Sequence, residues 1–145
     1  MTYYNILKDY KWRLDGHGYA VSDWYDDNGR YTMSLHAAII ELSGQIVPYG
    51  HEIDHKDGDK LNNLDENLRI CTSGQNKHNR GKNKNNTSGF KGVVWCKSSK
   101  NWRSQIMINN NPIHLGYFNS VYDAAFAYNI AALKHHGEFA RLNDI

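Results

Sequence analysis

The sequence predicts a mixed α+β fold, in which a strand-and-helix module precedes a three-stranded antiparallel sheet packed on one α-helix. Residues 90–145 read as three strands followed by a helix, with a tight turn between the last two strands. Residues 1–80 hold shorter strand-like and helical runs, and a polar basic linker at 81–89 follows them. The apolar share is 40% of 145 residues, which favours small layers over one large core.

The first 50 residues form a lead-in whose elements are punctuated by turn and cap residues. Asn28-Gly29 predicts a two-residue hairpin turn, because both central residues of such a turn need positive φ. Ser34 is placed to cap a helix that Gly44 ends. We find no chemistry of its own in this lead-in. The predicted elements are strands near 10–14, 19–25 and 31–33 and a short helix with Leu35, Ala38, Ile39 and Leu42 on one face.

The C-terminal module is predicted from alternation and capping. Ser120 caps the helix, with Asp123 three residues on, and Gly137 ends it. Alternation along 102–108 turns one set of side chains to the helix and the other set outward. The predicted strands lie near 90–95, 102–108 and 113–118 with a turn at 109–112, the inward set is Trp102, Ser104, Ile106 and Ile108, and the helix face is Val121, Ala125, Tyr128, Ala132 and His135.

The charge distribution predicts a polyanionic partner. The net charge is only +2, but no Asp or Glu occurs from Asn67 through Tyr122. A long segment of one sign in a balanced chain indicates a partner of opposite charge. Trp95 and Trp102 interleave with the cations, which favours nucleic acid over a merely solvated face. The cations of this segment are Arg69, Lys77, Arg80, Lys82, Lys84, Lys91, Lys97, Lys100 and Arg103.

Two other classes of protein are excluded. Cys71 and Cys96 lie 25 residues apart and form no Cys-x-x-Cys pair, so neither a disulfide framework nor a four-cysteine zinc site is indicated. No apolar run approaches the roughly 18 residues of a membrane span. We therefore expect a cytoplasmic protein with no membrane partner, in a prokaryotic or phage-infected cell.

The densest group of polar residues lies between 51 and 80. Asp54 is a hard oxygen donor suited to Mg²⁺, and His55 can take a proton from water near neutral pH. Neighbours on a strand point to opposite faces, so these two need a local bend to share a site. Asn76 follows a predicted strand at 68–72 and a helix capped by Ser73. A hairpin that folds back into this helix could bring Asn76 beside Asp54.

This pattern resembles the HNH endonuclease family, in the branch whose motif begins with Asp-His and ends in Asn. The spacings are 12 residues from His55 to Asn67 and 9 from Asn67 to Asn76. The resemblance implies a ββα-metal fold at 51–80, with the nuclease module spanning 1–80. It also implies that Asp54 and Asn76 bind one divalent ion, Mg²⁺ with Mn²⁺ as the alternative. By the same resemblance, His55 is the general base and Asn67 braces the loop that orients it.

The roles of four other polar residues near this motif are predicted less specifically. His78 and Arg80 are candidate phosphate contacts, because cations close to a scissile phosphate are useful. His36 and His51 are expected to pack or to lie in loops.

Residues 88–144 resemble the Apetala2-type domain of plant ethylene-response factors. The matching strings begin at Gly89, Trp102, His114 and Asp123. The resemblance implies that the outer face of the sheet lies in the DNA major groove, with Val94, Cys96, Arg103, Gln105, Met107 and His114 on it. Arg103 and Gln105 are the expected base readers, and Lys82, Lys84, Lys91, Lys97 and Lys100 are expected to hold phosphates.

The function predicted is metal-dependent hydrolysis of phosphodiester bonds in double-stranded DNA, of the mobile, homing type. One HNH centre cuts one strand at a time, so a monomer or weak dimer should nick. Two alternatives stay open from the sequence: a non-catalytic DNA-binding regulator and an RNA-directed nuclease.

Overall fold

The structure, a computed structural model, describes residues 3–145 and confirms the mixed α+β fold. The chain forms two compact units, one ending at Asn76 and the other beginning at Lys77. Within 3–145, no helix combines the length and the apolar character that crossing a membrane requires.

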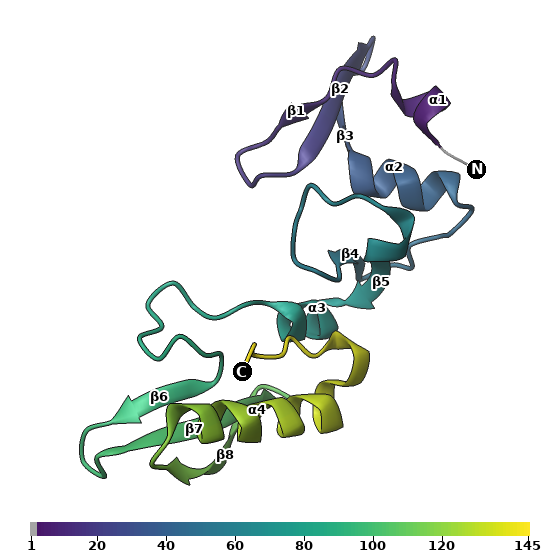
Figure 1. The fold of residues 1–145 in the computed structure, drawn as a ribbon. Coiled ribbons are helices and arrows are strands. Elements are labelled where there is room, and N and C mark those ends of the chain that lie inside the picture. Colours follow the sequence, from purple (N-terminus) through teal and green to yellow (C-terminus); the bar gives the residue numbers. More distant parts are fainter. Residues whose placement is uncertain (1–2) are drawn as a thin grey trace. The chain divides into compact units, whose positions relative to one another are not determined.

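The N-terminal unit contains two antiparallel sheets and two short helices before α3 (Figure 1). The first sheet has the order β1-β2-β3, and the second is the hairpin β4-β5. Its elements are α1 (Tyr4–Leu7), β1 (Arg13–Leu14), β2 (Ala20–Asp26), β3 (Gly29–Ser34), α2 (Leu35–Leu42), β4 (His51–His55), a 3₁₀ turn (Asp65–Asn67), β5 (Leu68–Thr72) and the start of α3 (Ser73–Asn79).

Helix α2 supplies the centre of this unit's core. Ala38, Ile39 and Ile40 are buried against Leu7 and Leu68, so the helix holds α1 and the β4-β5 hairpin together. Partly buried side chains complete the cluster: Tyr3, Trp12, Met33, Leu35, Ile53 and Ile70.

The lead-in hairpin and the start of α2 differ in detail from the sequence prediction. Asp26 pairs with Gly29, so Asp27 and Asn28 form the turn, and only Gly29 of the predicted pair has positive φ. The Asp26 carboxylate accepts from the Asn28 backbone N–H at 2.7 Å and holds this conformation. Ser34 occupies the N-cap position of α2, but its hydroxyl contacts the His36 ring instead of a backbone N–H.

The C-terminal unit is the predicted three-stranded antiparallel sheet with one helix across a single face (Figure 1). The order is β6-β7-β8, and buried alanines of α4 let the helix approach the sheet closely. The elements are β6 (Val93–Cys96), β7 (Asn101–Ile108), β8 (Asn111–Phe118), α4 (Val121–His136) and a 3₁₀ turn (Gly137–Phe139).

The start of β8 and one position on α4 were predicted wrongly. Asn109 and Asn110 both have positive φ and form a two-residue turn, so β8 begins at Asn111. Pro112 is tolerated inside β8 because this strand is an edge strand. At the end of α4, His136 is buried in place of His135, and its ring contacts the Met107 carbonyl oxygen at 2.9 Å.

The start of β6 also differs from the prediction, and it depends on Gly92. The structure begins β6 at Val93 instead of residue 90, because Gly92 turns the chain with a φ of +76°. A Cβ atom on Gly92 would lie 2.1 Å from a ring carbon of Tyr128 and 2.6 Å from the Gln105 carbonyl oxygen. Both the backbone conformation and the space therefore require glycine here.

We expect Gly92→Ala to destabilise the C-terminal unit by about 2–4 kcal/mol, since it combines a left-handed conformation with overpacking. Urea denaturation followed by circular dichroism measures this. Gly81→Ala is the control, because nothing lies within 4 Å of a Cβ at that position. Equal unfolding midpoints for the two variants would contradict the steric account.

Candidate active site

The antiparallel pairing of β4 with β5 places the two central motif residues. Asp54 lies opposite Arg69, and His55 lies opposite Leu68, in a regular register that runs to the end of β4. The bend that the sequence suggested is absent from this strand. Asp54 and His55 therefore leave opposite faces of the hairpin, at the end where β4 enters its loop.

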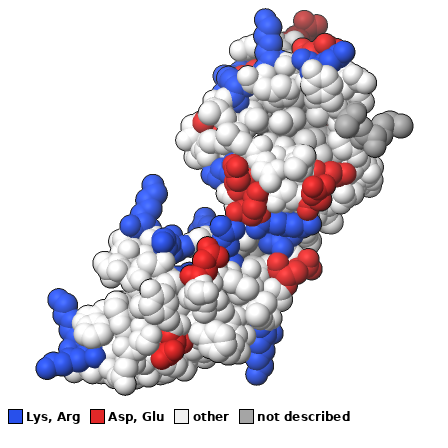
Figure 2. Space-filling model, in the orientation of Figure 1, with Lys and Arg blue, Asp and Glu red and all other residues white. Residues whose placement is uncertain are grey.

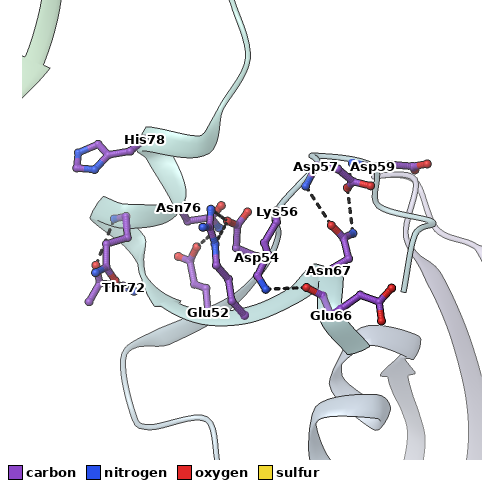
Figure 3. Close-up of polar contacts among 12 residues, drawn as sticks. Glu52, Asp54, Lys56, Asp57, Asp59, Glu66, Asn67, Thr72, Asn76 and His78 are labelled. Carbon is purple, nitrogen blue, oxygen red and sulfur yellow. Dashed lines mark hydrogen bonds and ion pairs between the residues drawn. The ribbon is translucent and has the colours of Figure 1, made fainter. Parts of the chain in front are cut away.

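One face of the hairpin gathers a carboxylate pair, a guanidinium and an amide. The Asp54 carboxylate is 6% exposed and accepts from Nε and Nη2 of Arg69 at 2.9 and 2.7 Å. Asn76 of α3 donates its amide N–H to Glu52 at 2.5 Å. Figure 3 shows Glu52 and Asp54 of β4 and Asn76 of α3 pointing toward one another. The sequence prediction that the hairpin brings Asn76 beside Asp54 therefore agrees with the geometry.

The position of Asn76 follows from the start of α3. Thr72 Oγ1 accepts from the Gln75 backbone N–H at 3.2 Å, and the Gln75 side chain accepts from the Thr72 N–H at 2.8 Å. This reciprocal pair is a capping box, and it makes Thr72 the cap in place of the predicted Ser73. Because Thr72 ends β5, the cap fixes the helix directly to the hairpin.

The other face of the hairpin packs His55 among rings. His55 is 4% exposed, and its ring centroid lies 5.3 Å from that of His36 and 6.0 Å from that of Tyr19. Burial lowers the pKa of His36 to about 4, with the neighbouring His55 as a smaller cause. His36 is therefore neutral at pH 7 and adds no positive charge beside His55.

Asn63 determines which nitrogen of His55 carries the proton. Its amide nitrogen donates to the carbonyl oxygens of Lys60 and Leu61, so its Oδ1 is the atom that faces His55 Nε2, at 3.1 Å. An amide oxygen can only accept, so Nε2 must hold a hydrogen. In neutral His55 the basic lone pair is then on Nδ1, which is the tautomer a base at that nitrogen needs.

Asn67 ties together the loop that carries Asn63. Its Oδ1 accepts from the Asp57 N–H at 3.1 Å, and its Nδ2 donates to Asp57 Oδ1 at 3.0 Å and to the Asn62 carbonyl at 2.7 Å. The Asn62 side chain and the Asp59 backbone bond the Asp57 carboxylate and lower its pKa. Asn67 thus closes the loop that carries Asn63; that it orients His55, as the resemblance implies, stays a prediction.

The donor set around Asp54 fits a hard divalent ion. Carboxylate oxygens of Asp54 and Glu52 and the amide oxygen of Asn76 are the ligand types that Mg²⁺ and Mn²⁺ prefer. Because Asn76 directs its nitrogen at Glu52, its oxygen points away from that carboxylate. Among residues 3–145, no group of three or more His, Cys, Asp and Glu side chains could hold a metal by itself, so an amide or water ligands would complete the shell.

The residues predicted to contact phosphates differ in exposure and in their partners within the chain. The His78 ring stacks on His136, with centroids 3.7 Å apart, and Lys91 donates to the His78 carbonyl at 2.6 Å. Partial burial lowers the pKa of Lys91 to about 8, and its contact with a phosphate stays a prediction. Lys82 donates to the Gly89 carbonyl oxygen at 2.9 Å. Arg80, Lys84, Lys97 and Lys100 are exposed.

The outer face of the β6-β7-β8 sheet carries the predicted reader residues. Val94 pairs with Arg103, Arg103 with Tyr117, and Gln105 with His114, so these side chains share the face that α4 leaves uncovered. Met107 is half exposed. The Nε of Arg103 is buried, with no hydrogen-bond partner in the described part of the chain. Figure 2 shows basic side chains gathered where β6 turns into β7, the position of Lys97 and Lys100.

Sequence reasoning missed four residues that form hydrogen bonds with side chains of this site. Arg69 and Asn63 each bond a predicted functional side chain, and Glu52 and Asp57 each bond one of the predicted asparagines. Arg69 could have been found from the hairpin register, since it lies directly opposite Asp54. The contact of Asn63 depends on the loop conformation, which no spacing in the sequence reveals.

Comparison with known proteins agrees with this geometry. The family described as HNH endonuclease matches residues 35–78, which include both strands of the hairpin and most of α3. An uncharacterized HNH endonuclease of Acanthamoeba polyphaga mimivirus is 37% identical over 142 residues, covering 97% of this chain and 70% of that protein. Protein 3.8 of Escherichia phage T7 is 32% identical over 106 residues, covering 73% of this chain and 87% of that protein.

We expect Asn63→Ala to allow His55 to populate both of its neutral tautomers. With the acceptor removed, the Nε2 proton loses its partner, and the ring distributes its proton over both nitrogens. Nitrogen-15 NMR of the His55 ring distinguishes the two tautomers directly. Asn5→Ala, a substitution on the exposed face of α1, should leave the His55 signals unchanged. An unchanged tautomer in Asn63→Ala would show that another group fixes it.

We also expect His36 to make stability depend on pH. Its pKa is about 4 in the folded protein but near 6.5 when unfolded, so the unfolded chain binds the proton first. The stability is therefore complete above pH 6.5 and is lost as pH falls toward 4. Melting temperatures between pH 7 and 4.5 should fall less in His36→Gln than in the wild type. The exposed His17→Gln variant is the control and should follow the wild type.

Proposed function

The chain belongs to the HNH endonuclease family and is a nuclease, and we propose that it hydrolyses phosphodiester bonds of double-stranded DNA with His55 as general base. The observation that carries this proposal is the contact between His55 Nε2 and Asn63 Oδ1. It directs the basic lone pair to Nδ1, where a water can lose its proton while it attacks phosphorus. Removal of that proton increases the nucleophilicity of the water.

Burial of His55 sets a condition on this role. At 4% exposure, the ring reaches a substrate only through a bound water or after the covering loop moves. The loop is held by Asn67 and by Lys60, whose ammonium donates to the His17 carbonyl at 2.8 Å and lies over the Tyr19 ring. We propose that these contacts keep His55 oriented until DNA enters at the end of β4.

We propose Asp54 and Asn76 as the ligands of one divalent ion, Mg²⁺ or Mn²⁺, with Glu52 beside them. When bound, such an ion neutralises negative charge on the phosphate and on the leaving oxygen. Arg69 already neutralises part of the Asp54 charge and holds the carboxylate in one orientation. The pair thereby positions a ligand that is otherwise nearly buried.

We propose that the C-terminal unit is the Apetala2-type DNA-binding module that the sequence of residues 88–144 resembles. Its support is the uncovered sheet face that carries Arg103, Gln105 and His114, because a sheet can enter the major groove. Exposed lysines at 84, 97 and 100 would hold phosphates beside it. A cutting unit joined to a reading unit is the arrangement expected of a site-preferring enzyme of the homing type.

A single active centre per chain predicts nicking by a monomer. One HNH centre attacks one phosphodiester bond, so a double-strand break needs two chains or two successive events. The non-catalytic regulator and the RNA-directed nuclease are outcomes of the experiment below.

We expect His55→Ala to reduce nicking of supercoiled plasmid by about 10²–10⁴-fold, the usual contribution of a general base. The assay contains Mg²⁺ or Mn²⁺, and EDTA should stop the wild type. His135→Ala, an exposed histidine of α4, is the matched control and should cut normally. Wild-type protein that shifts DNA in a gel but never cuts supports the regulator, and cleavage of RNA duplexes alone supports the RNA-directed enzyme.

We expect Arg103→Ala to affect DNA binding differently from substitution of the lysines in the β6-β7 turn. Arg103→Ala should cost about 1–3 kcal/mol on a preferred sequence and little on random DNA. Replacing Lys97 and Lys100 with alanine should weaken binding to all sequences and reduce the salt slope by about one per lysine. Lys8→Ala, in the N-terminal unit, is the control. Uniform loss in every variant would contradict sequence readout by Arg103.

A further inference from the structure

The outer face of α4 carries a continuous apolar stripe that the C-terminal unit does not use. Tyr122, Phe126, Ile130 and Leu133 are between 54% and 62% exposed. Their spacing of four, four and three residues keeps them within roughly 80° of the helix circumference, because each residue turns the helix by about 100°. We name these four residues the α4 stripe.

The α4 stripe is separate from the cores of its unit. The opposite side of α4 buries Ala124, Ala125, Ala131 and Ala132 against the sheet. Of the stripe, only Tyr122 has a ring contact within the unit, edge-on to Phe90. The visible surface over α4 in Figure 2 is mostly neither acidic nor basic. A contiguous apolar strip of this kind marks an interaction site and not ordinary surface variation.

Charges at the two ends of the α4 stripe identify the partner. Asp123 lies beside the stripe in the first turn of α4, and Lys134 lies beside it in the last turn. When two such helices pack antiparallel, Phe126 of one copy meets Ile130 of the other, and Asp123 meets Lys134 twice. A two-fold interface requires this kind of self-complementary surface. Antiparallel helix dipoles favour the same arrangement.

We propose that two copies of this chain pair antiparallel through the α4 stripe. A membrane surface is a poorer partner, because its anionic lipids attract helices with a predominantly basic polar face. DNA is also poorer, because it binds cations and not an apolar strip. One acidic and one basic residue beside the stripe match neither anionic lipid nor DNA. Asp123 of one copy can pair with Lys134 of another.

The pairing is expected to be weak and dependent on concentration. The α4 stripe spans eleven helical steps, or about 17 Å. One helix face of this length buries less area than the interface of a stable complex. Two paired chains bring two copies of His55, one for each strand of a duplex. The pairing itself does not rest on the proposed nuclease function, because it concerns a different unit of the chain.

Sedimentation equilibrium of the full chain from about 5 to 500 μM tests the pairing. We expect the weight-average mass to rise toward that of a dimer across this range, since a small interface gives weak, transient association. Phe126→Glu should remain monomeric over the range. Ile46→Glu, which also places a charge at an exposed apolar position but outside the α4 stripe, should associate like the wild type.

Charge reversal tests the antiparallel register. Asp123→Lys and Lys134→Asp alone should each weaken association about ten-fold or more, because each places like charges opposite one another twice. An equimolar mixture of the two variants should form a heterodimer with wild-type affinity, and so should the double variant with itself. The double variant also controls for any effect of Asp123→Lys on the start of α4.

Three results would overturn the proposal. The wild type could remain monomeric throughout, or it could dimerise without regard to Phe126→Glu and the charge reversals. Hydroxyl-radical footprinting could also show the side chains of the α4 stripe shielded in a monomer, which would mean that another part of the same chain covers them. Loss of DNA cleavage with dimerisation intact would leave the pairing standing and would count against the proposed nuclease function alone.

Discussion

The antiparallel register of β4 and β5 is the constraint on which the candidate active site depends. Pairing Asp54 with Arg69 puts a buried carboxylate beside the guanidinium that compensates it, which a nearly buried charge requires. The same register turns His55 to the opposite face, toward Tyr19 and His36. A slip of one residue would exchange the two faces and separate both residues from their partners. Thr72 then ends the strand and caps α3, so the position of Asn76 depends on the same strand pairing.

The loop after β4 determines which ring nitrogen of His55 carries the proton. Asn67 and Asp57 close the loop through reciprocal hydrogen bonds, and the closed loop presents Asn63 to the ring. The neutral His36 beside it keeps a second positive charge away. Polar residues of the loop thus act together on one proton position, which would prepare His55 for the role of general base that we propose.

The C-terminal unit divides its surfaces between two uses. Small residues of α4 pack against one face of the sheet, which leaves the other sheet face uncovered for Arg103 and Gln105. The far side of the same helix then has no neighbour within the unit and carries the α4 stripe. In this small unit, the proposed DNA binding and the proposed pairing of chains would therefore use different surfaces, because the inner and outer faces of α4 carry different side chains.

The sequence by itself determined the fold class, the three C-terminal strands and the single helix, because alternation and caps are local signals. It also indicated that a hairpin could bring Asn76 beside Asp54. Tertiary structure decided the rest. Arg69, Asn63 and His36 contact site residues through cross-strand pairing, a loop path and helix packing, and none of these is local in sequence. It also directed the Lys91 ammonium to the His78 carbonyl, and buried His136 in place of His135. Side-chain partners depend on how elements pack, and packing is decided by the whole chain.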